Sequence, residues 1–301
     1  MAFMRVGTVS ELWRYPVKSM RGDRVDETAV TEHWGLPGDR GWVIRDEDAG
    51  ELRSAKKWAE LLQFHARYVE EPQGDATPTI EIEFPDGSSM RSDDDRVHEL
   101  LSAALGRRVS LHPRRPADDH EHYRRLAVDE ADLRSQLGLG PDDPFPEFTG
   151  MPADVLAELD DYVSPRGTYF DALPLSLMTS TALRSLQSAL PDSAIDPRRF
   201  RKNVIVQHES EGSGAGADSD ATGGGHPEFE WVGRRVAIGE VECEVVMRIS
   251  RCRMVTLPQA DLPRDRGILR SLARENGSKF GVYLRALTPG TIREGDDVQL
   301  V

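Results

Sequence analysis

Hydrophobic and polar residues alternate along much of the first stretch of the chain, MRVGTVSELWRYPV at residues 4–17. Because successive side chains of a strand point to opposite faces, this alternation predicts a β-strand. Farther on, GWVIRDEDAGELRSA at residues 41–55 predicts a hairpin that turns around Asp48, Ala49 and Gly50. The N-terminal part is therefore predicted to form antiparallel sheet.

A helical period replaces this alternation at a few places. In DDDRVHELLSAALG, residues 93–106, the apolar residues fall on one helical face, an aspartate can cap the start and Gly106 can end the helix. Further helices are predicted within residues 55–64, 180–190 and 263–277.

Strand signals return in the second half of the chain. They occur in FRKNVIVQ at residues 200–207, in a hairpin at 234–249 that turns near Gly239, and in the final segment 280–301. Many short strands joined by Pro-Gly and Gly-Asp turns are typical of sheets that curl into barrels. The sequence therefore predicts a β-rich α+β protein in which a few helices cover barrel-like sheets.

Two segments show neither the alternation of a strand nor the apolar spacing of a helix. Residues 113–147 are polar and proline-rich, which predicts a linker or a long connection. This segment contains His120 and His122, and a His-x-His pair can bind metal on a strand, but the polar surroundings favour a solvated connection. Residues 210–225 are rich in glycine, serine and aspartate and are predicted to be a disordered loop.

Composition narrows the classes of function. The chain has 301 residues and a formal net charge of −14 at pH 7. Nucleic acids and anionic membranes attract basic surfaces, so neither is an expected partner. No run of about eighteen apolar residues occurs, and the N-terminus lacks the apolar stretch of a signal peptide. Because two cysteines cannot form a disulfide framework, we expect a cytoplasmic protein.

The two cysteines have different surroundings. Cys243 belongs to a predicted strand, one face of which carries Val241, Cys243, Val245 and Met247. We therefore expect Cys243 to be a small buried hydrophobe. Cys252 follows this strand in ISRCRMVTLP, between Arg251 and Arg253. Neighbouring cations favour the thiolate, the better nucleophile and metal ligand, although an ordinary surface cysteine explains these residues equally well.

Three polar motifs could bind an anion. Lys18 and Ser19 stand at the end of the first predicted strand, and Arg40 follows Asp39 just before the next one. In RRFRKN an extended chain would place alternate side chains on one side, namely Arg199, Arg201 and Asn203. Guanidinium groups and an amide suit an anion or a heterocycle, and the alternative is a solvated loop or a charged strand edge.

Motifs of several common enzyme classes are missing. The sequence contains no phosphate-binding P-loop, no G-x-G-x-x-G after a strand, no G-x-S-x-G and no H-E-x-x-H. It therefore gives no support to a P-loop nucleotide enzyme, a serine hydrolase of the elbow type or a zinc protease.

In their order along nearly the whole chain, these motifs resemble the MOSC-domain molybdenum-cofactor proteins, in the form that carries an N-terminal MOSC β-barrel region. The resemblance rests on YPVKS, GLPGDRGWVI, FDALPLSLMTSTAL, FRKNVIV, SRC and FGVYLRALTPGTIREGDDVQLV. The mitochondrial amidoxime-reducing component and its bacterial relatives are the functional type that the chain resembles most. The resemblance implies a MOSC N-terminal β-barrel region over residues 1–125 and a MOSC domain over residues 126–301.

The resemblance also implies a molybdenum cofactor, a pterin that carries a dithiolene and a phosphate. Cys252 matches the family's thiolate ligand to molybdenum and takes the catalytic position. The implied cofactor-binding residues are Lys18, Ser19, Arg40, Asp171, Arg201, Asn203, Ser250 and Arg251.

The implied function is an oxidoreductase that removes oxygen from small N-hydroxylated substrates. Electrons would come from a separate protein, a ferredoxin or a b-type cytochrome system, because two cysteines cannot ligate an internal iron–sulfur cluster. The alternative is a cofactor carrier or a sulfur-transfer module without turnover. The chain departs from some relatives at Ile249, where they carry a second cysteine.

Overall fold

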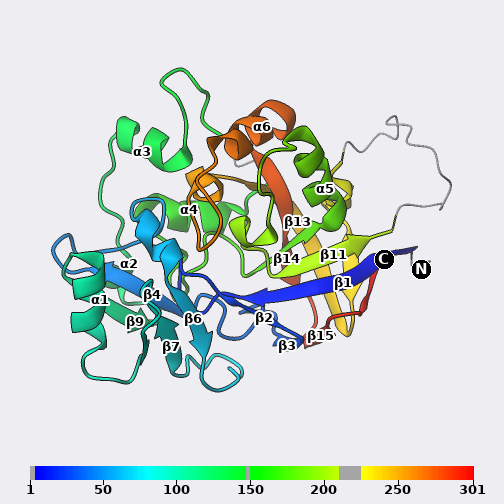
Figure 1. Cartoon of the computed structure of the whole chain (residues 1–301). Coiled ribbons are helices and arrows are strands. Elements are labelled where there is room, and N and C mark those ends of the chain that lie inside the picture. Colours follow the sequence, from blue (N-terminus) through cyan, green and yellow to red (C-terminus); the bar gives the residue numbers. More distant parts are fainter. Residues whose placement is uncertain (1–3, 147–149, 210–224) are drawn as a thin grey trace.

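The computed structural model describes residues 4–146, 150–209 and 225–301. Its largest part is a closed barrel of seven strands (Figure 1). In their order around the barrel the strands are β1 (Met4–Arg14), β11 (Val204–His208), β10 (Leu175–Thr179), β14 (Lys279–Ala286), β13 (Val241–Ser250), β12 (Arg235–Ile238) and β16 (Asp297–Leu300). The predicted β-rich α+β fold is confirmed.

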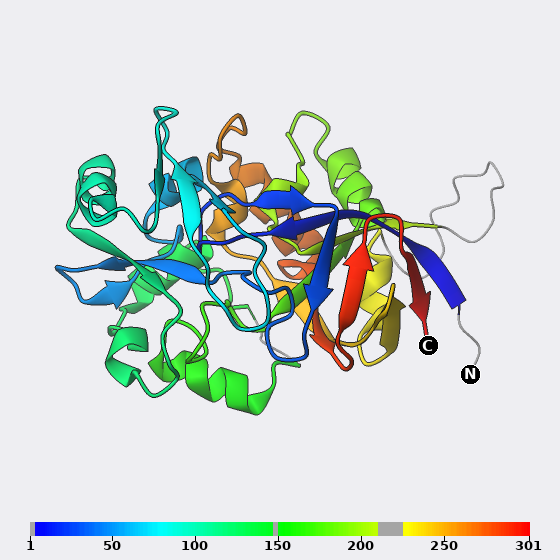
Figure 2. The same ribbon diagram turned by 90° about the horizontal axis from the view of Figure 1, so that it is seen from below.

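The first strand of the chain closes this barrel. β1 pairs with β16 on one side and with β11 on the other, and its last residues pair with β2 (Asp23–Val25). The close approach of β1 to β11 requires glycine at position 7, because a Cβ atom there would lie 2.3 Å from the Gln207 carbonyl oxygen. Met4, the first described residue, pairs with Leu300 and so lies beside the C-terminal strand (Figure 2). β1 lies within the first predicted region, residues 1–125, but it pairs with strands of the second region. The division of the chain between residues 125 and 126 therefore stays a prediction.

The barrel interior is apolar, and Cys243 is part of it. This residue pairs with Val236 on β12 and with Ala286 on β14, and its side chain is fully buried. Burial, and to a lesser degree the charge of Glu242, raises the pKa of the Cys243 thiol to about 12. The predicted role of Cys243 as a small buried hydrophobe is confirmed.

Two small sheets and a helix form the N-terminal part, which packs around a second core that includes Trp42, Leu61, Phe64 and Leu101. The elements are β4 (Trp42–Asp46), β5 (Glu51–Leu52), the 3₁₀ turn η1 (Ala59–Gln63), β6 (His65–Tyr68), β7 (Ile80–Glu83), β8 (Ser89–Arg91), α1 (Val97–Leu105) and β9 (Val109–Pro113). The predicted aspartate cap of α1 is wrong, because Arg96 occupies the cap position without a side-chain hydrogen bond. A separate pair of strands consists of β3 (Glu27–Val30) and β15 (Gly290–Arg293).

Two helices cover one outer face of the barrel (Figure 1). α5 (Ser180–Ala189) and α6 (Arg266–Asn276) occupy the positions that the sequence predicts for helices. Their apolar faces pack on outward side chains of the barrel, including Met178, Ile205 and Phe280. Within the described part of the chain, no helix is long and apolar enough to cross a membrane.

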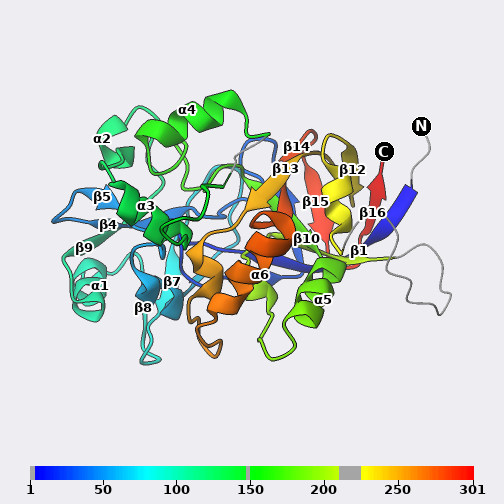
Figure 3. The same cartoon turned by 90° about the horizontal axis from the view of Figure 1, so that it is seen from above.

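The polar connection after β9 is folded rather than open. It carries α2 (His120–Tyr123), α3 (Glu130–Leu137) and α4 (Ala153–Asp161). In Figure 3, α2 and α4 lie at the border of the molecule, and α3 lies farther inward. The expectation of a solvated His-x-His motif is wrong for His122, whose side chain is buried. The predicted disordered loop at 210–225 lies outside the described residues except for Gly225.

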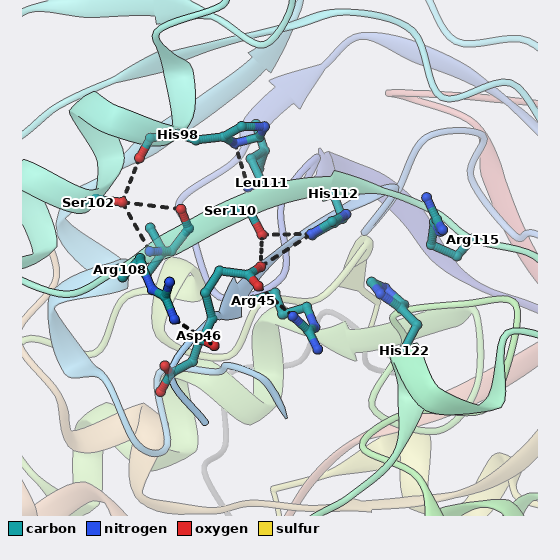
Figure 4. A network of polar contacts seen from close by, with 12 residues as sticks. Arg45, Asp46, His98, Ser102, Arg108, Ser110, Leu111, His112, Arg115 and His122 are labelled. Carbon is teal, nitrogen blue, oxygen red and sulfur yellow. Dashed lines mark hydrogen bonds and ion pairs between the residues drawn. The ribbon is translucent and has the colours of Figure 1, made fainter. Parts of the chain in front are cut away.

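Hydrogen bonds explain why His122 is buried. Its Nε2 lies 2.7 Å from the hydroxyl of Tyr169, which donates to the carbonyl oxygen of Pro113 at 2.9 Å. The ring also packs edge-on against His112, which bonds Ser110 on β9 (Figure 4). His122 therefore joins α2 to β9 and to the segment that leads into β10.

His122 predicts a specific loss of stability in acid. Burial, and then the nearby His112, lowers the pKa of His122 from 6.5 to about 4. Between these values the unfolded chain binds the proton more readily, so the stability contributed by neutral His122 is present above pH 6.5 and is lost as pH falls toward 4. From pH 7 to pH 4.5, the wild type should lose about 1–3 kcal/mol more unfolding free energy than His122→Gln.

Urea unfolding at the two pH values measures this difference. His33→Gln, which replaces an exposed histidine, is the control and should keep the wild-type dependence. Equal losses in the wild type and in His122→Gln would contradict the interpretation.

Candidate functional site

A pocket of about 410 Å³ opens where the barrel meets the N-terminal part and the connection that carries α3 and α4. Eight of the nine predicted site residues line it, and only Ser19 does not. These eight are Lys18, Arg40, Asp171, Arg201, Asn203, Ser250, Arg251 and Cys252. The fold thus brings together side chains that are far apart in sequence, while their chemical roles stay predictions.

A row of residues across the barrel wall forms the floor of the pocket. Met247 on β13 pairs with Tyr283 on β14, which pairs with Ser176 on β10. The Ser176 hydroxyl donates a hydrogen bond to Asn203 Oδ1 at 2.9 Å, and this bond continues the row to the start of β11. All four residues line the pocket, so its floor is built on the wall of the barrel.

A β-bulge turns the end of β13 toward the pocket. The pairing with β14 shifts between Val245 and Met247, and after this shift Met247 and Ile249 line the pocket. Val245 belongs to the barrel core, so the expectation that Met247 shares a face with Val241, Cys243 and Val245 is wrong. Bulges often re-aim side chains beside binding sites, and here the bulge precedes Cys252.

Cys252 is half-buried and begins the 3₁₀ turn η4 (Arg253–Thr256) directly after β13. Its two arginine neighbours point to different places. Arg251 lines the pocket, and its backbone N–H donates to the Ser278 carbonyl oxygen at 2.7 Å. Arg253 instead donates to the Ser135 hydroxyl on α3 at 3.2 Å. Only Arg251 therefore joins Cys252 in the wall of the pocket.

Left-handed backbone is concentrated at the predicted site. The described residues include five non-glycine residues with positive φ, and three of them are Ser19 at 70°, Arg40 at 51° and Arg201 at 53°. This conformation is costly for a residue with a side chain, and it is often retained at functional sites. Two of these three residues, Arg40 and Arg201, line the pocket.

The buried ring of Tyr15 supports both arginines. The guanidinium carbon of Arg201 lies 4.2 Å from the ring centroid, and that of Arg40 lies 5.3 Å from it. Arg40 also forms an ion pair with Asp39 and donates to the Arg201 carbonyl oxygen at 3.2 Å. Tyr15 therefore stabilises two cations beside each other by contact with its π face.

Lys18 and Asp171 form an ion pair inside the pocket. Lys18 Nζ donates to Asp171 Oδ1 at 2.9 Å and to the Tyr169 carbonyl oxygen at 2.8 Å. Burial lowers the pKa of Lys18, and the carboxylate of Asp171 opposes this shift. Burial alone would raise the pKa of Asp171, but the charges of Lys18, Lys56 and Arg40 hold it well below its usual value. Asp171 is therefore ionised at neutral pH.

The pocket carries an excess of positive charge in an acidic chain. Eight lysine and arginine side chains line it, against three acidic ones. Two buried donors, Arg201 Nη2 and Arg251 Nε, have no hydrogen-bond partner among the described residues. Burial, and then the nearby Arg40, lowers the pKa of Arg201 to about 10. Unpaired buried donors and crowded cations are the chemistry of a site for an anion.

Three predicted residues are held by protein contacts. The Ser19 hydroxyl accepts the backbone N–H of Ala55 at 2.9 Å, which shapes the loop behind the pocket. Asn203 is tied to Ser176 and also donates through Nδ2 to the Trp13 carbonyl oxygen at 3.3 Å. The Ser250 hydroxyl accepts from Lys279 Nζ at 2.8 Å. These contacts orient the site, and any cofactor contacts by the three residues stay predictions.

Sequence reasoning missed two contributors to the site. Tyr15 is the first residue of YPVKS, but nothing in the motif signals that its ring supports two arginines. Lys202 lines the pocket with Arg201 and Asn203, although strict strand alternation would place it on the opposite side. The positive φ of Arg201 breaks that alternation, and sequence periodicity cannot reveal such a local reversal.

Comparison with known families agrees with this architecture. The MOSC domain matches residues 165–299, and the MOSC N-terminal beta barrel domain matches residues 6–108. The chain belongs to the MOSC-domain family. Together the two matched regions cover most of this MOSC-domain protein.

The chain is also similar to curated MOSC-domain relatives. It is 26% identical to mitochondrial amidoxime-reducing component 1 of Mus musculus, in an alignment that covers 99% of this chain and 83% of the relative. It is 25% identical to mitochondrial amidoxime-reducing component 1 of Homo sapiens, over 99% of this chain and 84% of that protein.

The pocket of this MOSC-domain protein should bind simple anions when no larger ligand is present. Inorganic phosphate should raise the melting temperature of protein made without molybdenum cofactor. A ligand that binds only the folded state increases the free energy of unfolding by about 2.7 kcal/mol when its concentration is 100 times its dissociation constant. Arg201→Met should need roughly ten times more phosphate for the same rise in melting temperature, because a charge-assisted hydrogen bond is lost.

Thermal melts in phosphate at constant ionic strength test this expectation. Arg270→Met removes an exposed charge from α6 and should leave the phosphate response unchanged. An identical response in Arg201→Met and in the wild type would show that phosphate acts elsewhere.

Proposed function

We propose that this MOSC-domain protein binds a molybdenum cofactor and reduces small N-hydroxylated compounds with electrons from a separate protein. In the reaction an N–O bond breaks, two electrons and two protons are taken up, and the products are the N–H compound and water. The observation that carries the proposal is the position of Cys252, a half-buried thiol in the wall of a cationic pocket.

The residues of the pocket fit such a cofactor. Its phosphate is an anion, and Arg201 Nη2 and Arg251 Nε are buried donors without a partner among the described residues. Its metal accepts soft ligands, and Cys252 offers a thiolate sulfur. When bound, the cofactor supplies the redox chemistry that side chains lack.

The chain's own residues bind and orient in this scheme. Cys252 would hold the metal, and Arg40, Arg201 and Arg251 would hold anionic oxygens of the cofactor. Lys18 keeps Asp171 ionised at the edge of the pocket. Apolar side chains of α3 and α4, including Leu133 and Leu156, also line the pocket, where they can contact the hydrocarbon part of a substrate.

The names of the relatives favour this chemistry over simple cofactor storage. Amidoximes carry an N–OH group, and the mouse and human relatives are named amidoxime-reducing components. We infer a cytoplasmic location, because the two cysteines of the chain suit a reducing compartment.

The two cysteines should differ in what they contribute. Cys252→Ser should lower reduction of a hydroxylamine at least about 100-fold, since loss of even an indirect metal contact often costs 10- to 100-fold. Cys243→Ser should retain metal and activity but lower the unfolding free energy by about 1–3 kcal/mol, because it places a hydroxyl in the apolar barrel.

Metal content, initial rates and urea unfolding of both variants make this test. Loss of activity in Cys243→Ser with metal content and folding intact would contradict the assignment.

The purified protein should depend on an external electron donor. The sequence has no dinucleotide fingerprint, so NADH or NADPH alone should not sustain turnover, whereas a ferredoxin or b-type cytochrome system should. Because the chain is acidic overall, docking of the donor should depend on a local patch and on ionic strength.

A steady-state assay of cofactor-loaded protein with each nicotinamide, with and without a donor system, measures this dependence. Sustained turnover with a nicotinamide alone would overturn the external-donor claim. Failure of chemically reduced, fully loaded protein to convert any hydroxylamine or amidoxime would instead favour a carrier.

A further inference from the structure

Lys202 occupies an unusual position in the pocket. It lies between Arg201 and Asn203 just before β11, and its side chain is 3% exposed. Unlike the ammonium group of Lys18, which has carbonyl and carboxylate acceptors, the Lys202 ammonium donates no hydrogen bond to any residue in the described ranges. The pocket therefore contains a buried lysine whose amino group has no hydrogen-bond acceptor among the described residues.

The fold makes room for this side chain on β14. Gly281 has a φ of 74°, and a Cβ atom there would lie 3.1 Å from Lys202 Cε and 2.7 Å from the Leu177 carbonyl oxygen. Two residues farther along, the Tyr283 ring centroid lies 5.7 Å from Lys202 Nζ. The aliphatic part of the Lys202 side chain therefore packs against β14. This packing, rather than a counter-ion, orients the amino group.

The charges around Lys202 call for an anion. Burial, and then the like charges of Arg251 and Arg40, lowers the pKa of Lys202 well below its usual value, while Asp171 and Cys252 act in the opposite direction. Arg201 Nη2 and Arg251 Nε, two buried donors without a partner among the described residues, belong to two other residues of the same pocket lining. An anion bound among these three groups would satisfy all of them at once.

We propose that Lys202 is a direct anion-binding residue for the cofactor, and that its ammonium donates to an anionic oxygen held between Arg201 and Arg251. The inference rests on the proposed function, because the anion is the phosphate-bearing pterin. Lys202 thereby extends the binding set beyond the residues that the family resemblance implies.

The test compares Lys202→Met with the wild type and with Arg270→Met, which removes an exposed positive charge that is not part of the pocket lining. Each protein is produced once in a host that makes the cofactor and once in a host that does not. Molybdenum and oxidised pterin are quantified per protein after extended dialysis, and melting temperatures are recorded for both forms.

We expect Lys202→Met to retain cofactor roughly 10- to 100-fold less well than either comparison protein. Without cofactor it should melt at the same temperature as the wild type or higher, because a buried amino group without a hydrogen-bond acceptor is replaced by an apolar side chain of similar length. If Lys202 only stabilised the fold, Lys202→Met would instead lower the melting temperature of the cofactor-free protein.

The outcomes separate this inference from the proposed function. Wild-type protein that contains neither molybdenum nor pterin would overturn both. Loaded wild type together with equal retention in Lys202→Met would overturn the role of Lys202 alone, even if the variant had a raised KM. A lower melting temperature of the cofactor-free variant would also contradict the proposal.

Discussion

Several positive charges are buried beside one another at the pocket, and the surrounding structure is arranged to tolerate them. Taking a cation out of water costs several kcal/mol unless a partner compensates. Arg40 has Asp39, Lys18 has Asp171, and Arg201 has the face of Tyr15. Arg201 Nη2 and Arg251 Nε still have no hydrogen-bond partner among the described residues. An anionic ligand would supply acceptors for these donors and would compensate the excess positive charge.

The barrel determines where these charges meet. Leu12 on β1 pairs with Val204 on β11, so the loop with Lys18 and the loop with Arg201 leave the barrel near each other. The row from Met247 through Tyr283 to Ser176 connects them to the bulged end of β13, where Cys252 follows. The closure of the barrel by the first strand of the chain is therefore a requirement of the site as well as of the fold.

Much of this architecture could be predicted from periodicity. The strand of residues 4–17, the hairpins and the two outer helices follow from alternation, turn residues and apolar faces. Local reversals could not be predicted: the bulge that re-aims Met247 and the positive φ of Arg201 that brings Lys202 into the pocket leave no periodic signal. Burial of His122 depends on Tyr169, 47 residues away, so a local pattern could not reveal it.

Molybdenum-edge X-ray absorption of cofactor-loaded protein tests the central claim most directly, because it counts the sulfur neighbours of the metal. We expect the wild type to show one more sulfur neighbour than Cys252→Ser, and Cys243→Ser to match the wild type. An unchanged sulfur count in a Cys252→Ser protein that still holds molybdenum would contradict the account, since the metal would then be bound without the thiolate around which the pocket is interpreted.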